Sequence, residues 1–547
     1  MKGVDANSAR GRRENQISIV RKEKRDENLM KRRTGSLRET AEEVSAPVTA
    51  WGVNVDTGDA KLTPVYHKFT EADFPQMLVG LKSTDVEVAL TNLRGFRRLL
   101  SAEKNPPVQQ CIDCGVIPLF VEMLQRHESR ELQFEAAWAL TNIASTDRTR
   151  VVVECGAVPH LVNLLLNQDA DVRDQSAWGL GNVAGDSPEL RDVVLAQPRV
   201  VDSILQNLAQ PANLPLMRNC TWTLSNFCRG KPQPPLPVLL PALPMLAHLL
   251  ARSNDADTTV DACWALSYIS DGDNDRIVAV VDQGVVPALV TMLKTEKTLQ
   301  IIPALRTIGN IVSGNDKCTQ AVVDSDFLPA AAMLLENPKK NIRKETCWAL
   351  SNIAAGSAAQ LAQLMQYPKL ISGILEALSQ SSEWDVRKEA AWVVSNVATS
   401  GQVAHLSTLV EEGVVEPLCD LLTQGDSKII LVALDALESI LKLGVSQGST
   451  TYAQMIQDCQ GVDRMENLQE HKNQEVYEKV VLLLETYFGA DDEEDENFAP
   501  ATAGNTFAFG IPNAAPLTAN YGKTAAGTDF NSNSFLQNAP AFDFAAF

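Results

Sequence analysis

Long hydrophobic runs are absent from this sequence of 547 residues. A membrane-spanning helix needs about 18–20 consecutive apolar residues. The most apolar stretch, Leu236–Leu250, is interrupted by Pro237, Pro241 and Pro244. The charged N-terminal region also lacks the apolar core that a secretory signal requires. We therefore expect no membrane insertion.

Cysteine and histidine are sparse and show no pattern of a metal or catalytic site. The ten cysteines and six histidines have no spacing in common. Cys111 and Cys114 form one C-x-x-C pair, but Cys114 precedes Gly115 as Cys155 precedes Gly156, which indicates a repeated turn. We expect neither a disulfide framework nor a metal site. No catalytic nucleophile or phosphate-binding loop is visible, so we expect no enzymatic activity and no cofactor.

Positive charge is scarce in the chain as a whole and concentrated at one end. The chain has 48 Lys and Arg residues against 68 Asp and Glu residues, a net charge of −20, yet residues 1–38 contain 12 basic and 5 acidic residues. An acidic protein binds nucleic acid poorly and favours basic ligands. We expect no direct nucleic-acid binding, and we expect the basic head to be attracted to the acidic body.

A nine-residue motif recurs with a period of 40 to 44 residues. Its copies read AAWALTNIA, SAWGLGNVA, CTWTLSNFC, ACWALSYIS, TCWALSNIA and AAWVVSNVA, with tryptophans at 138, 178, 222, 264, 348 and 392. In the one gap of double length, ALRTIGNIV places Arg306 at the tryptophan position. A second motif, G-x-x-P, keeps the same phase, as at Gly115–Pro118 and Gly156–Pro159. Weaker copies flank the series around Arg97 and Asp435.

The repeat predicts helices, because no unit alternates apolar and polar residues with a period of two. Two or three helices in such a period are typical of armadillo and HEAT arrays, in which each repeat buries its apolar faces against its neighbours. We predict an all-α armadillo-repeat solenoid, a right-handed superhelix of about ten repeats, over residues 69–488. Residues 50–68 would be a flexible linker, and the acidic, then Phe/Ala/Asn-rich residues 489–547 a disordered tail.

Trp and Asn four residues apart lie on one face of a helix. A repeated aromatic residue at helical spacing is often a core residue, and this alternative stays open. The neighbouring Ala137, Leu140 and Ile143 already supply a buried stripe, however, and a buried Asn would need a hydrogen-bond partner. We therefore favour a surface role for the pairs.

A row of such pairs suits an extended basic peptide. The Asn amide can hydrogen-bond to a peptide backbone, and neighbouring indoles can hold the stem and charged head of Lys or Arg. Glu345 and Glu389 each stand three residues before a tryptophan, and Asp186 stands four after Asn182, so these carboxylates are candidates for selecting cations.

The row is interrupted at its centre, where Tyr268 replaces the asparagine of one repeat and Arg306 replaces the tryptophan of the next. The interruption predicts two binding segments. Their centres would be roughly 45 Å apart, a distance that about 13 extended residues could bridge. A ligand with two basic clusters could therefore occupy both.

The W-x-x-x-N series with this central interruption resembles the importin-α (karyopherin-α) family, adaptors that carry proteins with basic nuclear localisation signals into the nucleus. The resemblance implies a major signal-binding site at Trp138, Asn142, Gln175, Trp178, Asn182, Asp186, Trp222 and Asn226. It implies a minor site at Arg306, Glu345, Trp348, Asn352, Glu389, Trp392 and Asn396.

The N-terminal head, residues 1–49, resembles the importin-β-binding segment of this family. Its cations include Arg12, Arg13, Arg21, Lys22, Lys24, Arg25, Lys31, Arg32 and Arg33. The last three resemble a localisation signal within the chain itself, so we expect the head to occupy the groove and inhibit cargo binding until importin-β captures it.

The resemblance also implies partners and a location. The partners would be importin-β, cargo proteins with one or two basic clusters, an export receptor with GTP-bound Ran and, indirectly, nuclear pore proteins. The chain would shuttle between cytoplasm and nucleus. A scaffold of the β-catenin kind is the main alternative, but its groove is basic, whereas the tryptophan rows here have acidic flanks.

Overall fold

The computed structural model describes residues 69–102, 105–489, 501–503 and 506–508. The predictions for residues 1–68 and for most of residues 489–547 lie outside the described residues. The chain divides into two compact units between Phe488 and Gly489.

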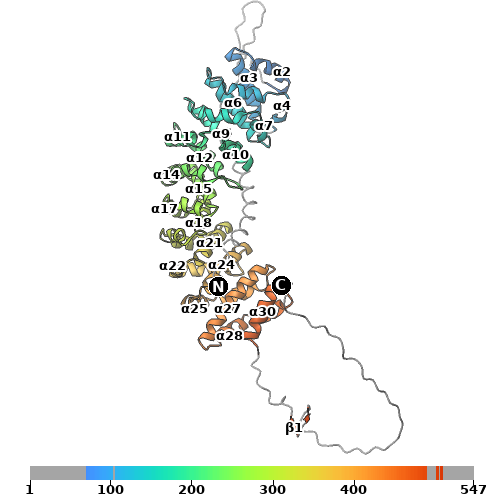
Figure 1. The fold of residues 1–547 in the computed structure, drawn as a ribbon, viewed down its shortest axis with the longest axis vertical. Helices are drawn as coiled ribbons and strands as arrows, with labels where there is room; N and C mark the ends of the chain where they lie inside the picture. The colour runs from blue at the N-terminus through green and yellow to red at the C-terminus, as the bar shows by residue number, and fades with distance from the viewer. Residues whose placement is uncertain (1–68, 103–104, 490–500, 504–505, 509–547) are drawn as a thin grey trace, which may run out of the picture. The chain divides into compact units, whose positions relative to one another are not determined.

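The first unit is a stack of helical repeats, each of which ends in a long third helix (Figure 1). The ten third helices are α3 (Val86–Leu100), α6 (Arg130–Ala144), α9 (Ala170–Asp186), α12 (Leu214–Cys228), α15 (Ala256–Ser270), α18 (Thr298–Ile311), α21 (Lys340–Ala354), α24 (Trp384–Thr399), α27 (Ser427–Ser446) and α30 (Gln474–Tyr487). They pack against one another in chain order. The predicted helical array is confirmed, and one period of the sequence is one step of the stack.

Two shorter helices precede each third helix. The first helices are α4 (Val108–Asp113), α7 (Thr149–Glu154), α10 (Pro188–Leu195), α13 (Leu236–Leu239), α16 (Asn274–Val281), α19 (Asp316–Val323), α22 (Ala358–Met365), α25 (Val403–Glu411) and α28 (Thr451–Asp458). The second helices are α5 (Ile117–Met123), α8 (Ala157–Leu164), α11 (Val200–Ala209), η2 (Leu240–Ala242) with α14 (Leu243–Arg252), α17 (Val286–Leu293), α20 (Phe327–Leu335), α23 (Pro368–Leu378), α26 (Val415–Leu421) and α29 (Gly461–Leu468). The opening repeat has η1 (Glu71–Asp73) and α2 (Phe74–Leu81) instead.

The glycine of the G-x-x-P motif forms the turn between the first and second helices. Gly115 has a φ of 72° between α4 and α5, and Gly156 has a φ of 78° between α7 and α8. Positive φ favours glycine because any other residue brings its Cβ against the backbone. Arg199, Asp326 and Gln460 occupy the same turn in other repeats with φ of 63°, 60° and 59°, so three repeats hold this conformation without glycine.

Acidic or amide side chains begin most of the third helices. Oδ1 of Asp169 accepts a hydrogen bond from the N–H of Val172 at 3.1 Å, and Oδ2 of Asp255 accepts one from the N–H of Thr258 at 2.9 Å. These caps satisfy N–H groups that have no partner within the helix. Arg218 of the preceding repeat also binds Asp255 at 2.5 Å, so this cap links neighbouring repeats.

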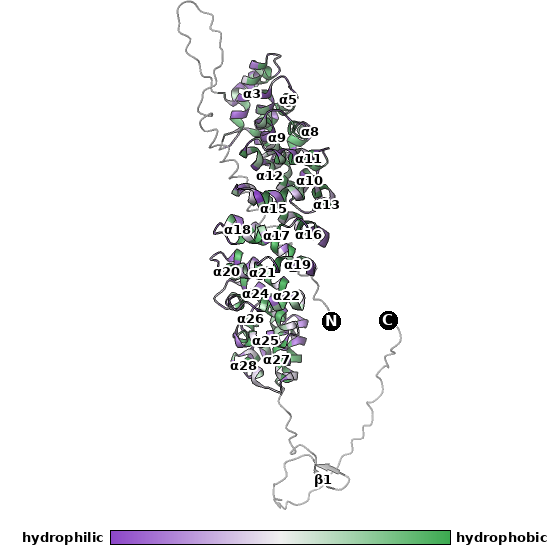
Figure 2. Cartoon of the chain, turned by 90° about the vertical axis from the view of Figure 1, so that its left-hand side faces the viewer, coloured by the Kyte–Doolittle hydropathy of each residue, from purple (hydrophilic) through white to green (hydrophobic). Residues whose placement is uncertain are grey.

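A continuous apolar core runs through the stack. Figure 2 shows green and purple residues mixed along the helices, as amphipathic packing requires. No single helix among the described residues is long and apolar enough to cross a membrane, and the one pair that passes together, Asn274–Val281 with Val286–Leu293, is bent by 84°. These two helices are the first and second helices of one repeat.

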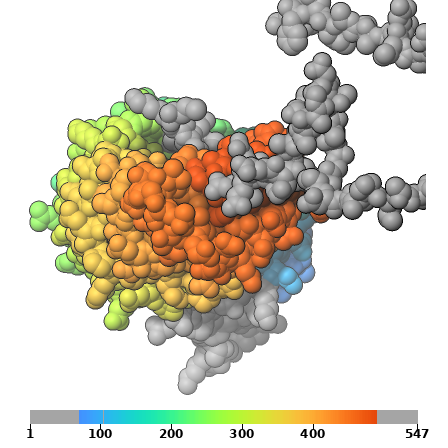
Figure 3. All heavy atoms as spheres, turned by 90° about the horizontal axis from the view of Figure 1, so that it is seen from below, coloured from blue at the N-terminus to red at the C-terminus, as the bar shows by residue number. Residues whose placement is uncertain are grey.

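The last repeats close the C-terminal end of the first unit. Seen from below in Figure 3, the orange C-terminal residues lie in front of the yellow and green residues of earlier repeats. Helix α30 packs on α27 and on α29. No further repeat follows α30 among the described residues.

The second unit contains one described pair of strands. Strands β1 (Ala501–Ala503) and β2 (Thr506–Ala508) are antiparallel, with Thr502 opposite Phe507. This pair was not predicted from the sequence, because three residues are too few to show an alternation of apolar and polar residues.

Candidate functional site

The asparagine of the W-x-x-x-N pair links several repeats to the preceding one. Nδ2 of Asn182, Asn226, Asn310 and Asn396 donates to the backbone carbonyls of Thr141 (3.1 Å), Gly181 (2.9 Å), Ser267 (2.9 Å) and Ser351 (2.8 Å), respectively. Each acceptor is the residue just before the asparagine position of the preceding third helix. The first member of the row, Asn142, instead donates to Oγ of Ser101 at 2.9 Å.

The tryptophans are more buried than a surface role requires. Trp138, Trp222 and Trp348 retain only 6%, 7% and 7% exposure, whereas Trp178 and Trp392 are partly exposed. By exposure, the prediction of a surface rather than a core role is wrong for Trp138 and Trp348, whereas Trp222, although nearly buried, lines the pocket described below. These side chains also belong to the packing between repeats.

Glycine in the preceding helix makes room for two of the indoles. A Cβ on Gly181 would approach Cζ3 of Trp222 closer than 3.0 Å, and a Cβ on Gly309 would do the same to Cζ3 of Trp348. Both glycines stand three residues after the tryptophan position. The six-membered ring of the indole in the next repeat lies against the glycine, which has no side chain. The carbonyl of Gly181 also accepts the hydrogen bond from Asn226.

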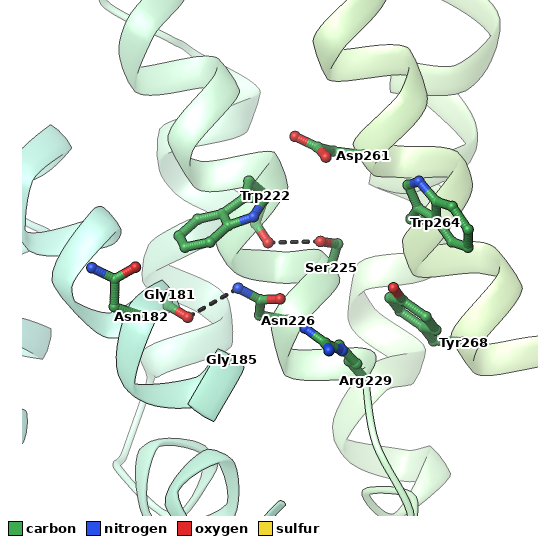
Figure 4. A pocket seen from close by; sticks show the side chains of 10 residues that line it. All are labelled: Gly181, Asn182, Gly185, Trp222, Ser225, Asn226, Arg229, Asp261, Trp264 and Tyr268. Carbon is green, nitrogen blue, oxygen red and sulfur yellow. Dashed lines mark hydrogen bonds between the residues drawn. The ribbon is translucent and has the colours of Figure 1, made fainter. Parts of the chain in front are cut away.

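Helices α9, α12 and α15 together line a pocket (Figure 4). Its lining residues are Gly181, Asn182, Gly185, Trp222, Ser225, Asn226, Arg229, Asp261, Trp264 and Tyr268. Figure 4 shows Trp222 and Asn226 on one side and Trp264 and Tyr268 on the other. The latter two rings stack with their centroids 5.8 Å apart. Flat apolar walls, amides and the Asp261 carboxylate suit the stem and head of a basic side chain.

At the start of the first row, an arginine of the chain covers the first indole. Arg97 occupies the tryptophan position of the first repeat, and its Cζ lies 4.1 Å from the ring centroid of Trp138. Its Nε is 2.7 Å from Oε2 of Glu135, which also binds Arg94 at 3.2 Å. Arg97 and Glu135 are both buried, so this cluster is a fixed part of the fold.

The second row starts with the same arrangement. Cζ of Arg306 lies 5.6 Å from the ring centroid of Trp348, and its guanidinium binds the Glu345 carboxylate. Glu345, predicted to select cations of the ligand, therefore already pairs with a cation of the chain. Both side chains keep about a fifth of their surface exposed, 20% for Arg306 and 19% for Glu345.

The remaining predicted site residues lie on the same helices. Gln175 is 5% exposed, and its Nε2 has no hydrogen-bond partner among the described residues. Asp186 is the last residue of α9 and is partly exposed. Asn352 lies on α21 and Glu389 on α24, and both are partly exposed. The nine predicted cations of the head lie outside the described residues.

The structure adds several groups to the site that the motif spacing did not predict. Ser101 meets Asn142, and Arg229, Asp261 and Tyr268 line the pocket of Figure 4. A usable signal existed for Asp261, which stands three residues before Trp264, as Glu345 does before Trp348. Arg97 could have been found in the same way, because it stands one period before Trp138.

The described residues offer no set of three or more metal-ligating side chains. The cysteines are single packing residues. Burial raises the pKa of Cys111 to about 12, and burial also raises the pKa of Cys220. A thiol with a raised pKa is a poor nucleophile and a poor metal ligand.

Comparisons with known proteins agree over most of the chain. The model of the Importin beta binding domain matches residues 1–93, and that of the Atypical Arm repeat matches residues 450–501. The Armadillo/beta-catenin-like repeat matches residues 104–145, 145–185, 234–271, 273–313, 315–355 and 404–442. A crystal structure of an engineered protein is similar with a TM-score of 0.68 and 28% identity, covering 76% of this chain and 98% of that chain.

Two relatives illustrate the similarity in sequence. Importin subunit alpha-1b of Oryza sativa subsp. japonica is 48% identical over 445 residues, which cover 80% of this chain and 82% of the relative. Importin subunit alpha-4 of Arabidopsis thaliana is 44% identical over 528 residues, which cover 94% and 96%. With this identity over this coverage, and with the helical array and tryptophan rows described above, the chain belongs to the importin-α family.

Proposed function

We propose that this chain is a nuclear import adaptor whose groove binds the basic localisation signals of cargo proteins and whose N-terminal segment binds importin-β. The observation that carries the proposal is the pocket between α9, α12 and α15, where indoles, asparagine amides and the Asp261 carboxylate converge. Family membership supports both halves of it. An adaptor binds its ligands without changing them, so no catalytic group is required.

The spacing of the third helices suits an extended peptide. Packed helices lie about 8–10 Å apart and an extended chain advances about 3.3 Å per residue, so one repeat corresponds to about three peptide residues. A side-chain amide has two N–H donors and one carbonyl acceptor. The neighbouring repeat uses one donor of Asn182 or Asn226, which leaves a donor and an acceptor for the peptide backbone.

The two rows should differ in affinity. The first row has three complete Trp and Asn pairs and the second has two. Replacing Trp178 and Asn182 by Ala should weaken the binding of a peptide with one basic cluster about tenfold, because a stacked cation and a backbone hydrogen bond each contribute about 0.5–1.5 kcal/mol.

The matched control replaces Trp392 and Asn396 by Ala. Asn396 makes the same inter-repeat hydrogen bond, at 2.8 Å against 3.1 Å for Asn182, so the two double variants carry a similar cost to the fold. Calorimetric titration of both variants with one peptide would measure the difference. Equal losses would contradict the assignment of the first row as the major site.

The head segment provides regulation in this proposal. Lys31, Arg32 and Arg33 resemble a localisation signal, and the linker that follows them has roughly 35 residues, with a coil reach of about 30–35 Å. A tether of this length holds the cluster near the groove at an effective concentration of about 1 mM. Cargo would therefore compete with the head until importin-β captures it.

Changing Lys31, Arg32 and Arg33 to Ala in the full chain tests the regulation. The variant should bind a signal peptide more tightly than the parent chain when importin-β is absent, and importin-β should tighten binding by the parent chain alone. A parent and a variant with the same peptide affinity would disprove autoinhibition without touching the assignment of the groove.

The proposal extends to the rest of the transport cycle. An export receptor with GTP-bound Ran would return the emptied chain to the cytoplasm, and contacts with nuclear pore proteins would be indirect, through importin-β. A fluorescent fusion of the chain should shuttle between nucleus and cytoplasm. A fusion that stayed in one compartment for hours would contradict this part.

A further inference from the structure

Each tryptophan row begins with the same unit of three side chains. A cation occupies the tryptophan position of one repeat, and a glutamate stands three residues before the tryptophan of the next. The units are Arg97, Glu135 and Trp138 in the first row and Arg306, Glu345 and Trp348 in the second. The same unit thus occurs twice, each time at the first tryptophan of a row.

The two copies differ in how firmly the arginine is held. Nε and Nη2 of Arg97 lie 2.7 Å and 3.3 Å from the two oxygens of Glu135, and the arginine side chain is 5% exposed. Arg306 is more exposed, at 20% of its side chain, and its Cζ lies 5.6 Å from the ring centroid of Trp348 against 4.1 Å for Arg97 and Trp138. Arg306 can therefore leave its place at a lower cost.

The contacts of Arg306 are those that a basic ligand would make. Its guanidinium lies over an indole, and it binds a carboxylate. Oε2 of Glu345 is buried and accepts no hydrogen bond from the described residues, so Arg306 is the one cation that pairs with this carboxylate among those residues. A ligand cation that binds between Trp348 and Glu345 therefore competes with Arg306, which already contacts the indole and one carboxylate oxygen.

We propose that Arg306 is a built-in competitor that occupies the first slot of the second row and lowers its affinity for basic peptides. The inference rests on the proposed function of the groove, and it identifies what makes the second row the weaker one. A peptide cation must displace the guanidinium from Glu345. Otherwise it binds at a position where Arg306 already neutralises the charge of the carboxylate. The buried Arg97 is the fixed counterpart at the start of the first row.

A cluster of charged side chains also lies at the C-terminal end of the second row. Nζ of Lys479 lies 2.7 Å from Oδ1 of Asp435 and 2.8 Å from Oε2 of Glu438. Asp435 holds the tryptophan position of its repeat, and Lys479 lies on the next third helix. The second row is thus bounded on both sides by cations that the chain pairs with its own carboxylates.

The test is a peptide titration of the full chain with Arg306→Gln. The background carries Trp178→Ala and Asn182→Ala, which weaken the first row. The probe is a lysine- and arginine-rich peptide with one basic cluster. Removing the competitor should tighten binding roughly fivefold. Affinity should also fall more steeply with salt, because Glu345 becomes free to pair with the peptide.

The matched control is Arg343→Gln in the same background. Arg343 lies on the next third helix and binds the Glu383 carboxylate, so its loss changes the net charge equally. It should leave peptide affinity unchanged. Arg306→Lys keeps the charge but lacks the planar guanidinium, and it should lie between the parent and the glutamine variant.

Weaker binding by Arg306→Gln would show that Arg306 contacts the peptide directly and would overturn the proposal, as would an affinity equal to that of the Arg343→Gln control. If instead the parent chain without any substitution bound no basic peptide even with importin-β present, the proposed function itself would fail. Circular dichroism of each variant checks that the helical array is intact, and Arg306→Lys carries the test if the glutamine variant unfolds.

Discussion

Nδ2 of Asn226 donates a hydrogen bond of 2.9 Å to the backbone carbonyl of Gly181 in the preceding repeat. The same bond recurs at three other interfaces. An asparagine in the middle of a helix is unfavourable unless its amide is used, and here its first use is structural. We therefore expect substitutions of these asparagines to change stability as well as the proposed ligand binding.

Replacing Asn226 by Ala should lower the free energy of unfolding by about 1 kcal/mol, because the buried carbonyl of Gly181 loses its side-chain donor. Chemical denaturation followed by circular dichroism measures the loss. Asn163→Ala is the control, since Asn163 is exposed on α8. A loss of the same size in both variants would rule out the inter-repeat bond as the cause.

Replacing Gly181 by Ala should displace the indole of Trp222, because the added Cβ would approach Cζ3 closer than 3.0 Å. Overpacking of this kind costs about 1–3 kcal/mol, and the shifted indole should also weaken peptide binding. Gly425→Ala is the control, since nothing lies within 4 Å of a Cβ at that position. Unchanged stability of Gly181→Ala would show that the indole can move freely.

The array of about ten repeats could be predicted because the motif recurs at a regular spacing along the sequence. The period could not reveal that Gly181 lies under Trp222, or that Arg306 covers Trp348, since both contacts join residues about 40 positions apart. Such contacts depend on the rotation between repeats. The burial of the indoles was mispredicted for the same reason, because the sequence does not show how closely one third helix approaches the next.

The turn positions with positive φ predict stabilising substitutions. Arg199→Gly and Gln460→Gly should each raise the free energy of unfolding by about 0.5–1 kcal/mol, because they relieve backbone strain at φ of 63° and 59°. Asp326→Gly should gain less, since Asp tolerates this conformation better. The reverse change, Gly156→Ala at φ of 78°, should destabilise. Thermal denaturation of the four variants tests the order, and a loss of stability in Arg199→Gly would contradict it.

The cap at Asp255 predicts acid sensitivity. Burial acts to raise the pKa of Asp255, but hydrogen bonds from Arg218 and Thr258 outweigh it and lower the pKa to about 2. Because the folded-state pKa is below the unfolded value, the carboxylate stabilises the fold above about pH 4, and this contribution disappears as the pH falls from about 4 to about 2. It amounts to about 2 kcal/mol at most.

Asp255→Asn should therefore lower stability at pH 7 and match the parent chain near pH 2, as measured by urea denaturation across this range. Asp257→Asn is the control, because Asp257 is 66% exposed and lies 3.4 Å from the same Arg218. A stability difference between parent and Asp255→Asn that stayed constant down to pH 2 would contradict the assignment of the ion pair.

Tyr268 stands where an asparagine would otherwise bind the preceding repeat, and a phenol carries no amide. The interface between α12 and α15 therefore cannot form the amide-to-carbonyl bond found at four other interfaces, and the ion pair of Arg218 and Asp255 links these repeats instead. Within a row, the bonds keep adjacent slots at a constant spacing. A ligand with two basic clusters would therefore meet two regularly spaced rows, separated by one interface that an ion pair holds in place of an asparagine amide.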